Sequence, residues 1–141
     1  MIVGVDPGRK TGVSVYLPGP GTLIRCATMD WWSAFAYISG ELGAAKAVIV
    51  EDPAQNAPVF ARGLAGAPLT RLAQNVGANK QMATLLIEGL KREGMKVIPV
   101  RPSKEKWDAD SFQEHFTYNG RTSQHARDAA RLVHLYITGT L

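Results

Sequence analysis

Cysteine is nearly missing from this chain of 141 residues, in which Cys26 is the single example. One thiol excludes an intrachain disulfide and any zinc site built from several cysteines of the same chain. Scarce cysteine is typical of a reducing, intracellular compartment. No basic segment followed by an apolar run opens the sequence, and no apolar run approaches the roughly 20 residues of a membrane helix. We therefore expect a cytoplasmic protein that does not enter a membrane.

Negative charge is the scarcer sign in this sequence. Twelve Asp and Glu stand against 16 Lys and Arg, which leaves a formal net charge of +4. That excess favours anionic partners through long-range attraction. Hydrophobic residues make up 45% and charged residues 20%, close to the average of globular proteins, and internal repeats are missing. We expect one globular domain over residues 1–141.

Five short segments have the composition of β-strands, being rich in β-branched residues and bounded by Gly, Pro or acidic residues. They span residues 2–6, 11–17, 22–28, 47–51 and 96–100. Short turns join the first three, which predicts an antiparallel meander. The fourth is an almost unbroken apolar run, as expected of a strand covered on both faces, and Pro99 places the fifth near an edge.

Three segments show the apolar spacing of helices, and they span residues 31–42, 69–91 and 124–137. Segment 104–116 is helical in parts. Segment 53–70 contains five Gly and Pro residues, which predicts a loop with a turn of helix. The resulting order, β-β-β-α-β-α-β-α-α, predicts an α/β fold with a mixed sheet and helices packed on its faces.

Acidic residues end two of the apolar strands, Asp6 the first and Glu51 the fourth. In a mixed sheet such strand ends can lie side by side at one rim. Two close carboxylates repel each other unless a cation neutralises them, and oxygen ligands select hard ions such as Mg²⁺ or Mn²⁺. For either acid alone, a solvated strand end is the better explanation.

The last predicted helix offers two more metal ligands near its start. His125 and Asp128 lie three residues apart and therefore project from one face. Taken singly, Asp128 is explained as an exposed charge close to Arg131, and His125 as an ordinary residue of the first turn. We expect His115 and His134 to be ordinary helix residues.

Three stretches of the chain together resemble the motifs of one family. They read Val5-Asp6-Pro7-Gly8 followed by Thr11-Gly12-Val13, then Val48-Ile49-Val50-Glu51, and then His125-x-x-Asp128-Ala129. In order and spacing they resemble RuvC-type Holliday junction resolvases, of the compact bacteriophage kind, within the ribonuclease H-like superfamily. The resemblance spans nearly the whole chain.

The resemblance implies a ribonuclease H-like mixed sheet, in which three antiparallel strands are followed by parallel strands, with helices on both faces. It implies that Asp6, Glu51 and Asp128 bind metal, and that His125 stands where many members have a further Asp. Two Mg²⁺ or Mn²⁺ ions would activate a water and stabilise the leaving 3′ oxygen, with Asp6 between the ions. The softer imidazole ligand favours manganese.

The activity implied is that of an endonuclease resolving four-way and other branched DNA junctions by paired nicks. A four-way junction is two-fold symmetric, so paired nicks imply a homodimer. Such hydrolysis needs no covalent protein intermediate, which agrees with a sequence that has no evident Ser/His/Asp or Cys/His arrangement.

Candidate DNA contacts are the basic, amide and aromatic residues around these motifs. They are Arg9, Phe60, Arg62, Arg71, Asn75, Asn79, Lys80, Lys104 and Lys106. The cations and amides suit phosphates or base edges, and Phe60 suits stacking on an unpaired base. Lys106 precedes Trp107 in a segment similar to the family's, so it is the candidate for contacting the scissile phosphate. Each cation is otherwise explained as a surface charge, and Phe60 as a cover of the core.

Three other functions fit parts of the sequence. A ribonuclease H-like nuclease acting on RNA/DNA hybrids would share the acids and work as a monomer. An actin-like ATPase would share Asp6-Pro7-Gly8 and Thr11-Gly12 but needs two such domains around its nucleotide. A non-catalytic DNA-binding module would need the basic composition alone.

Overall fold

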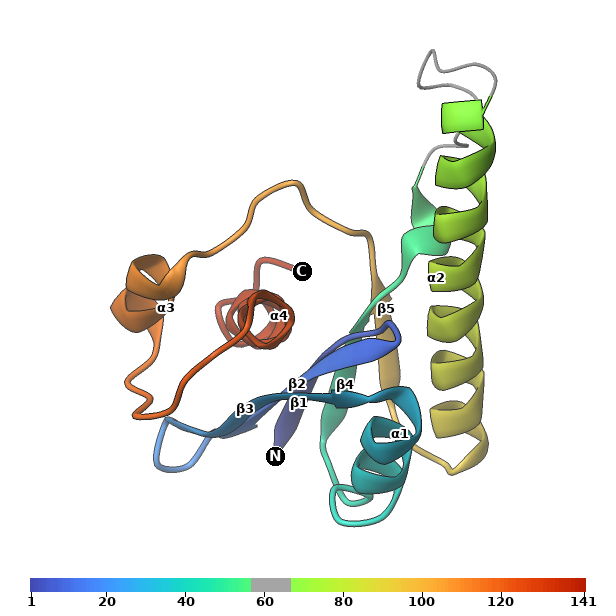
Figure 1. Ribbon diagram of the computed structural model, residues 1–141. Helices are drawn as coiled ribbons and strands as arrows, with labels where there is room; N and C mark the ends of the chain where they lie inside the picture. The colour runs from blue at the N-terminus through green and yellow to red at the C-terminus, as the bar shows by residue number, and fades with distance from the viewer. Residues whose placement is uncertain (57–66) are drawn as a thin grey trace.

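One mixed sheet of five strands organises the molecule (Figure 1). The computed structural model describes residues 1–56 and 67–141, with the backbone alone at 67–73, 75 and 76. The strands are β1 (Ile2–Asp6), β2 (Lys10–Leu17), β3 (Thr22–Asp30), β4 (Ala47–Glu51) and β5 (Val97–Val100). Their order in the sheet is β3-β2-β1-β4-β5. The first three pair antiparallel, and β4 and β5 continue the sheet in parallel. This is a ribonuclease H-like topology, and the predicted fold class is confirmed.

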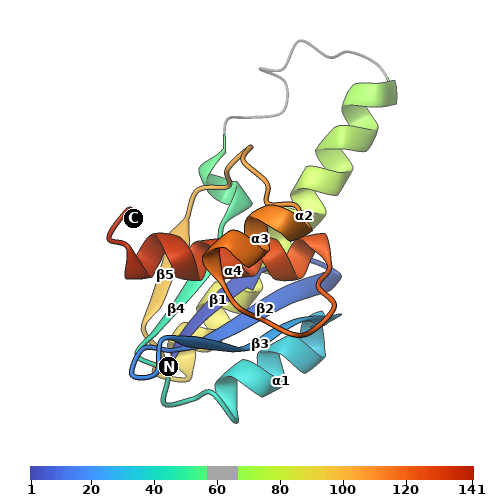
Figure 2. The same ribbon diagram turned by 90° about the vertical axis from the view of Figure 1, so that its left-hand side faces the viewer.

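Helices cover both faces of the sheet (Figures 1 and 2). They are α1 (Trp31–Ser39), the short 3₁₀ helix η1 (Pro53–Gln55), α2 (Ala67–Arg92), α3 (Ala109–His115) and α4 (Gln124–Ile137). Helices α1 and α2 pack on one face, whereas α3 and α4 lie on the other. None of the helices in the described part of the chain is long and apolar enough to cross a membrane.

Segment 104–116 is helical in part, as predicted: its helix is α3, which begins where the Asp108 carboxylate accepts the backbone N–H of Ser111 at 2.8 Å and caps it. Two other predicted boundaries are wrong. The helix expected over 31–42 ends at Ser39, with Gly40 as its C-cap. Helix α2 begins inside the predicted loop 53–70, since Pro68 lies in its first turn, where no backbone donor is required. The turn of helix expected in that loop is η1.

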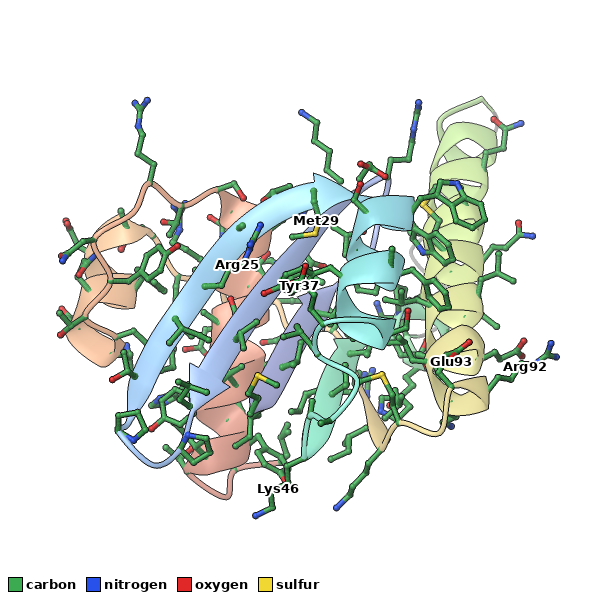
Figure 3. The ribbon with its side chains drawn as sticks, turned by 90° about the horizontal axis from the view of Figure 1, so that it is seen from below. Arg25, Met29, Tyr37, Lys46, Arg92 and Glu93 are labelled. Atoms are coloured by element: carbon green, nitrogen blue, oxygen red, sulfur yellow. The ribbon has the colours of Figure 1, made fainter. Side chains whose placement is uncertain are left out.

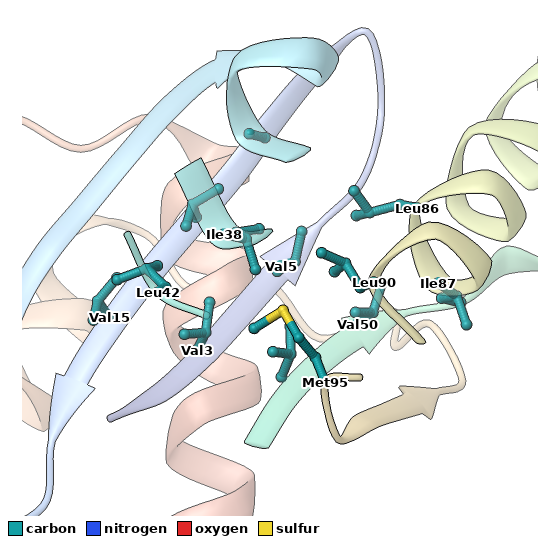
Figure 4. Packing of buried hydrophobic residues seen from close by; sticks show 13 residues of the cluster. Val3, Val5, Val15, Ile38, Leu42, Val50, Leu86, Ile87, Leu90 and Met95 are labelled. Atoms are coloured by element: carbon teal, nitrogen blue, oxygen red, sulfur yellow. The ribbon is translucent and has the colours of Figure 1, made fainter. Parts of the chain in front are cut away.

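Alternating residues of the central strands face opposite layers. Val3 and Val5 of β1 pack with α1 and α2 in one apolar cluster (Figure 4). Ile2 belongs to the second cluster, which α3 and α4 cover. The even-numbered residues of β1 therefore face α4, and the last of them is Asp6.

Candidate active site

Asp6 and Glu51 stand at the same level on neighbouring parallel strands. The register of β1 and β4 pairs Val5 with Val50, so the next residues along both strands are the two acids. Adjacent strands lie about 4.8 Å apart. Ile49, two residues before Glu51, belongs to the cluster under α4, so strand alternation directs Glu51 to the same face as Asp6. The predicted meeting of the two strand ends is confirmed.

Glycines let α4 approach this part of the sheet closely. A Cβ atom on Gly4 would lie 2.0 Å from the carbonyl oxygen of Ala129, and one on Gly12 would lie 2.0 Å from that of His125. Any side chain at either position would force α4 away. The Ser14 hydroxyl next in line donates to the Ala126 carbonyl at 3.1 Å. The first turns of α4 are thus held directly over β1 and β2.

The start of α4 brings His125 onto Asp6. The Nδ1–H group of His125 donates to Oδ2 of Asp6 at 2.8 Å. The Asp6 side chain is only 12% exposed, whereas that of His125 is 52% exposed. Burial raises the pKa of Asp6, the bond and charge of His125 oppose the rise, and the charge of Asp128 adds to it. A cation near Asp6 would offset the cost of burying this carboxylate.

Asp128 is buried and is paired with Lys106. The Nζ atom of Lys106 lies 2.8 Å from Oδ2 of Asp128, and the amide of Gln124 donates to Oδ1 at 2.9 Å. Burial acts to lower the pKa of Lys106, but the bond to Asp128 and the charges of the acids outweigh it and raise the pKa. Arg131 pairs with Glu105 instead, at 2.8 Å. The explanation of Asp128 as an exposed charge close to Arg131 is therefore wrong.

The negative charges of Asp6 and Asp128 both affect the pKa of Glu51. Its pKa rises from 4.5 to about 7, chiefly because the carboxyl is partly buried and then because of the negative charges of Asp6 and Asp128. The charge of Lys106 opposes this rise. The three carboxylates thus form one electrostatic cluster, in which the charges of Asp6 and Asp128 make Glu51 harder to ionise.

A hydrogen-bonded frame fixes the segment that carries Lys106. The carbonyl of Trp107 accepts from Nε2 of Gln124 at 3.1 Å and from Nε of Arg127 at 3.0 Å. The Arg127 guanidinium also donates to the Thr122 carbonyl at 2.8 Å. Sequence reasoning missed Gln124 and Arg127 as site-supporting residues. One available signal was the spacing of Gln124 and Asp128, which are four apart on a helix and so share a face.

Trp107 is buried and anchors this frame in the core. The ring of His115 stacks on its indole at 4.2 Å between centroids, and the ring of His134 meets it edge-on at 5.4 Å. Both histidines therefore lie around Trp107 as packing groups, which agrees with the expectation that they are ordinary helix residues.

Of the five residues predicted to carry chemistry, His125 bonds Asp6, Lys106 bonds Asp128, and Glu51 is linked to both acids through charge. The predicted DNA contacts are spread more widely. Arg9 lines an open cleft beside His125, and Lys104 is exposed. Asn79 is exposed and Lys80 half-buried on α2, where Arg71 and Asn75 also lie. Phe60 and Arg62 fall outside the described residues.

The oxygen ligands of this cluster suit a hard cation, although two of the three acids are bonded to nitrogen groups of neighbouring side chains. Within residues 1–56 and 67–141, no three or more His, Cys, Asp or Glu side chains stand where they could hold a metal ion. Lys106 and His125 instead bond Asp128 and Asp6. Three carboxylates that repel one another match the ligands preferred by Mg²⁺ or Mn²⁺. Metal binding would require these nitrogen contacts to rearrange.

The chemistry of this cluster has to be judged from its own side chains. Neither the models of known protein families nor the curated proteins contain a match to this chain.

Proposed function

We propose that this chain is a metal-dependent endonuclease that resolves four-way and other branched DNA junctions by paired phosphodiester hydrolysis. The observation that carries the proposal is the convergence of Asp6, Glu51 and Asp128 at one rim of a ribonuclease H-like sheet. His125 and Lys106 join them through direct bonds. This is the constellation that the resemblance to junction resolvases requires.

The residues divide the work between them. Asp6, Glu51, Asp128 and His125 would hold two Mg²⁺ or Mn²⁺ ions, which when bound supply an activated water and stabilise the leaving 3′ oxygen. Lys106 keeps its proton beside Asp128 and is 47% exposed, so it can meet an incoming phosphate as a cation. Gln124 also bonds Asp128, so that carboxylate would keep a partner if Lys106 turned to a phosphate.

The test is cleavage of a synthetic mobile four-way junction with Mg²⁺ or Mn²⁺, with the cuts mapped on each strand. We expect metal-dependent cuts placed symmetrically near the crossover, each leaving a 5′ phosphate. An RNA/DNA hybrid duplex is the parallel substrate. Cutting of the hybrid alone would favour the alternative nuclease, and cutting that persists in excess chelator would overturn the metal-dependent mechanism.

A homodimer is part of this proposal because paired nicks need two sites. An apolar patch on α1 and α2 supports it: Trp32 is 75% exposed and Leu85 is 50% exposed. With Trp31 and Met82 they line a shallow hollow of about 200 Å³. Exposed apolar patches often mark interaction sites.

Sedimentation velocity tests the dimer. Wild-type protein should sediment as a dimer and Trp32→Lys as a monomer. A Trp32→Lys monomer that still makes paired nicks within one binding event would contradict the dimer.

A further inference from the structure

An open cleft lies directly beside the acidic cluster. Its volume is about 990 Å³, and it is bounded by the turn between β1 and β2, the end of β3 and the start of α4. His125 forms part of its wall while bonding Asp6. Whatever occupies the cleft is therefore next to the carboxylates. The volume is at the upper end of the roughly 300–1,000 Å³ typical of ligand sites, and the open form suits a segment of polymer.

Two cations stand at the cleft without an acidic partner. Arg9 and Lys10 are both exposed, and neither forms an ion pair with any residue that the structure describes. Asp30 also lines the cleft, but its carboxylate accepts the backbone N–H of Ser33 at 2.9 Å and the Ser33 hydroxyl at 2.6 Å. Its oxygens thus cap α1, while its negative charge stays in the lining opposite Lys10 in the β2–β3 register. The cleft lining therefore holds two positive charges against one negative charge, which leaves a net attraction for an anion.

The cleft is built on fixed backbone. The buried Thr11 hydroxyl donates to the Gly8 carbonyl at 2.8 Å and ties the turn that presents both cations. The Thr28 and Ser123 hydroxyls hydrogen bond to each other and join β3 to α4 within the cleft lining. Met29 also lines the cleft near the end of β3, where its side chain packs on the side of the sheet that α1 covers (Figure 3). Exposed cations on a fixed turn suit the phosphates of a nucleic-acid strand.

We propose that this cleft binds the sugar-phosphate backbone of the DNA strand that is being cut, next to the scissile phosphate. Arg9 and Lys10 contact its phosphates. The strand then crosses the β1–β2 turn and reaches the carboxylates past His125. This proposal rests on the proposed function and adds the path that the strand takes.

The first measurement is metal-free binding of a labelled four-way junction in chelator, followed over a range of salt concentrations. The test variant is Arg9→Ala/Lys10→Ala. The matched control is Lys46→Ala/Arg92→Ala, which removes two exposed cations far from Met29 (Figure 3). Two lost phosphate contacts should flatten the slope of log K against log salt by about 1.4 to 1.8 in the test variant and leave it unchanged in the control.

The second measurement locates the contact. Junctions carrying a neutral methylphosphonate at one position at a time are bound by each protein. Wild type and control should lose affinity when a phosphate next to the cleavage site is neutralised, and Arg9→Ala/Lys10→Ala should be insensitive there.

The outcomes separate the two proposals. Equal slope changes in test and control variants, or equal sensitivity to every methylphosphonate, would overturn the cleft as the strand path while leaving the nuclease proposal intact. A wild-type protein that binds no junction would overturn both. Thermal unfolding of each variant is the control for folding. A melting temperature equal to that of wild type shows that the substitutions of these exposed residues leave the fold unchanged.

Discussion

The two faces of the sheet use the same strands for different purposes. Toward α1 and α2, β1 presents Val3 and Val5, both fully buried, within an aliphatic cluster. Toward α4, the alternate residues of that strand include Gly4 and Asp6. A strand period of two separates the faces completely, because neighbouring side chains never point to the same layer.

The two faces contribute differently to stability and to chemistry. Full burial of a valine contributes roughly 1.5–3 kcal/mol, and the α1/α2 face is built of such residues. The α4 face has an apolar cluster as well, but at its rim it also buries carboxylates, which burial destabilises, as the raised pKa values of Asp6 and Glu51 indicate. The apolar clusters offset the cost of this acidic rim. Substitutions on the two faces should therefore change different observables.

Asp6→Asn should have the largest effect, on activity alone. Losing the central carboxylate should slow junction cleavage by at least about 1,000-fold, or roughly 4 kcal/mol of transition-state stabilisation. Burial already disfavours the charge of Asp6, so the melting temperature should equal or exceed that of wild type. Single-turnover cleavage and thermal unfolding measure the two effects. Cleavage at a near wild-type rate would remove Asp6 from the site.

Gly12→Ala should lower both stability and the cleavage rate, because Gly12 lies where α4 packs against the sheet. The new methyl group would lie 2.0 Å from the His125 carbonyl, so α4 must move. We expect a loss of about 3 kcal/mol in unfolding free energy and a cleavage rate roughly 10- to 100-fold lower.

Gly77→Ala is the control for this substitution, since a Cβ there meets nothing within 4 Å on α2. It should stabilise the protein by up to about 1 kcal/mol. If Gly12→Ala behaves like Gly77→Ala, the close packing of α4 is wrong.

Val5→Ala should have the opposite effect to Asp6→Asn, lowering stability while leaving cleavage nearly unchanged. Removing two buried methyl groups should lower the unfolding free energy by about 2 kcal/mol. Cleavage per folded molecule should stay within about threefold of wild type, since the side chain faces the other layer. Urea denaturation and rates measured well below the melting temperature give both quantities. A selective loss of cleavage in the stable protein would break the separation of the faces.

Much of this arrangement follows from local sequence. Strands 2–6 and 47–51 were predicted with their observed bounds, because β-branched runs ending in acids leave little choice of period. Their parallel register then brings Asp6 and Glu51 together with no further information. Pro99 likewise indicates an edge, and β5 is one of the two edge strands.

What could not be predicted depends on contacts between segments without periodicity. Lys106 reaches Asp128 from a stretch with no regular structure, and the Trp107 carbonyl gains its donors from α4. The same holds for the cleft, which combines the turn bearing Lys10 with hydroxyls from β3 and α4. Such meetings depend on how closely α4 approaches the sheet, a property of the packed tertiary structure.

Glu51→Gln should give the smallest effect, a change in how stability depends on pH. This change measures how much the buried charge of Glu51 destabilises the fold. Because the folded pKa is about 7 against an ordinary 4.5, the wild-type protein loses stability as pH rises between these values. The variant has no such loss. In chelator it should therefore match wild type near pH 4.5 and exceed it at pH 8 by on the order of 1 kcal/mol, after allowance for solvent screening. Glu41→Gln, at an exposed position, is the control that should show no such gain.

Adding divalent ions to the same measurement tests whether the acids bind metal. At pH 8, Mg²⁺ or Mn²⁺ should raise the melting temperature of wild type, because bound cations neutralise the ionised Glu51 and its neighbours. The rise should be smaller in Glu51→Gln, which has lost a ligand and the repulsion that the ions relieve. A stability difference between variant and wild type that stays constant from pH 4.5 to 8 would mean that neither burial nor the charges of Asp6 and Asp128 raise the pKa of Glu51. In that case the three carboxylates would act separately, and the contrast between the faces would reduce to packing alone.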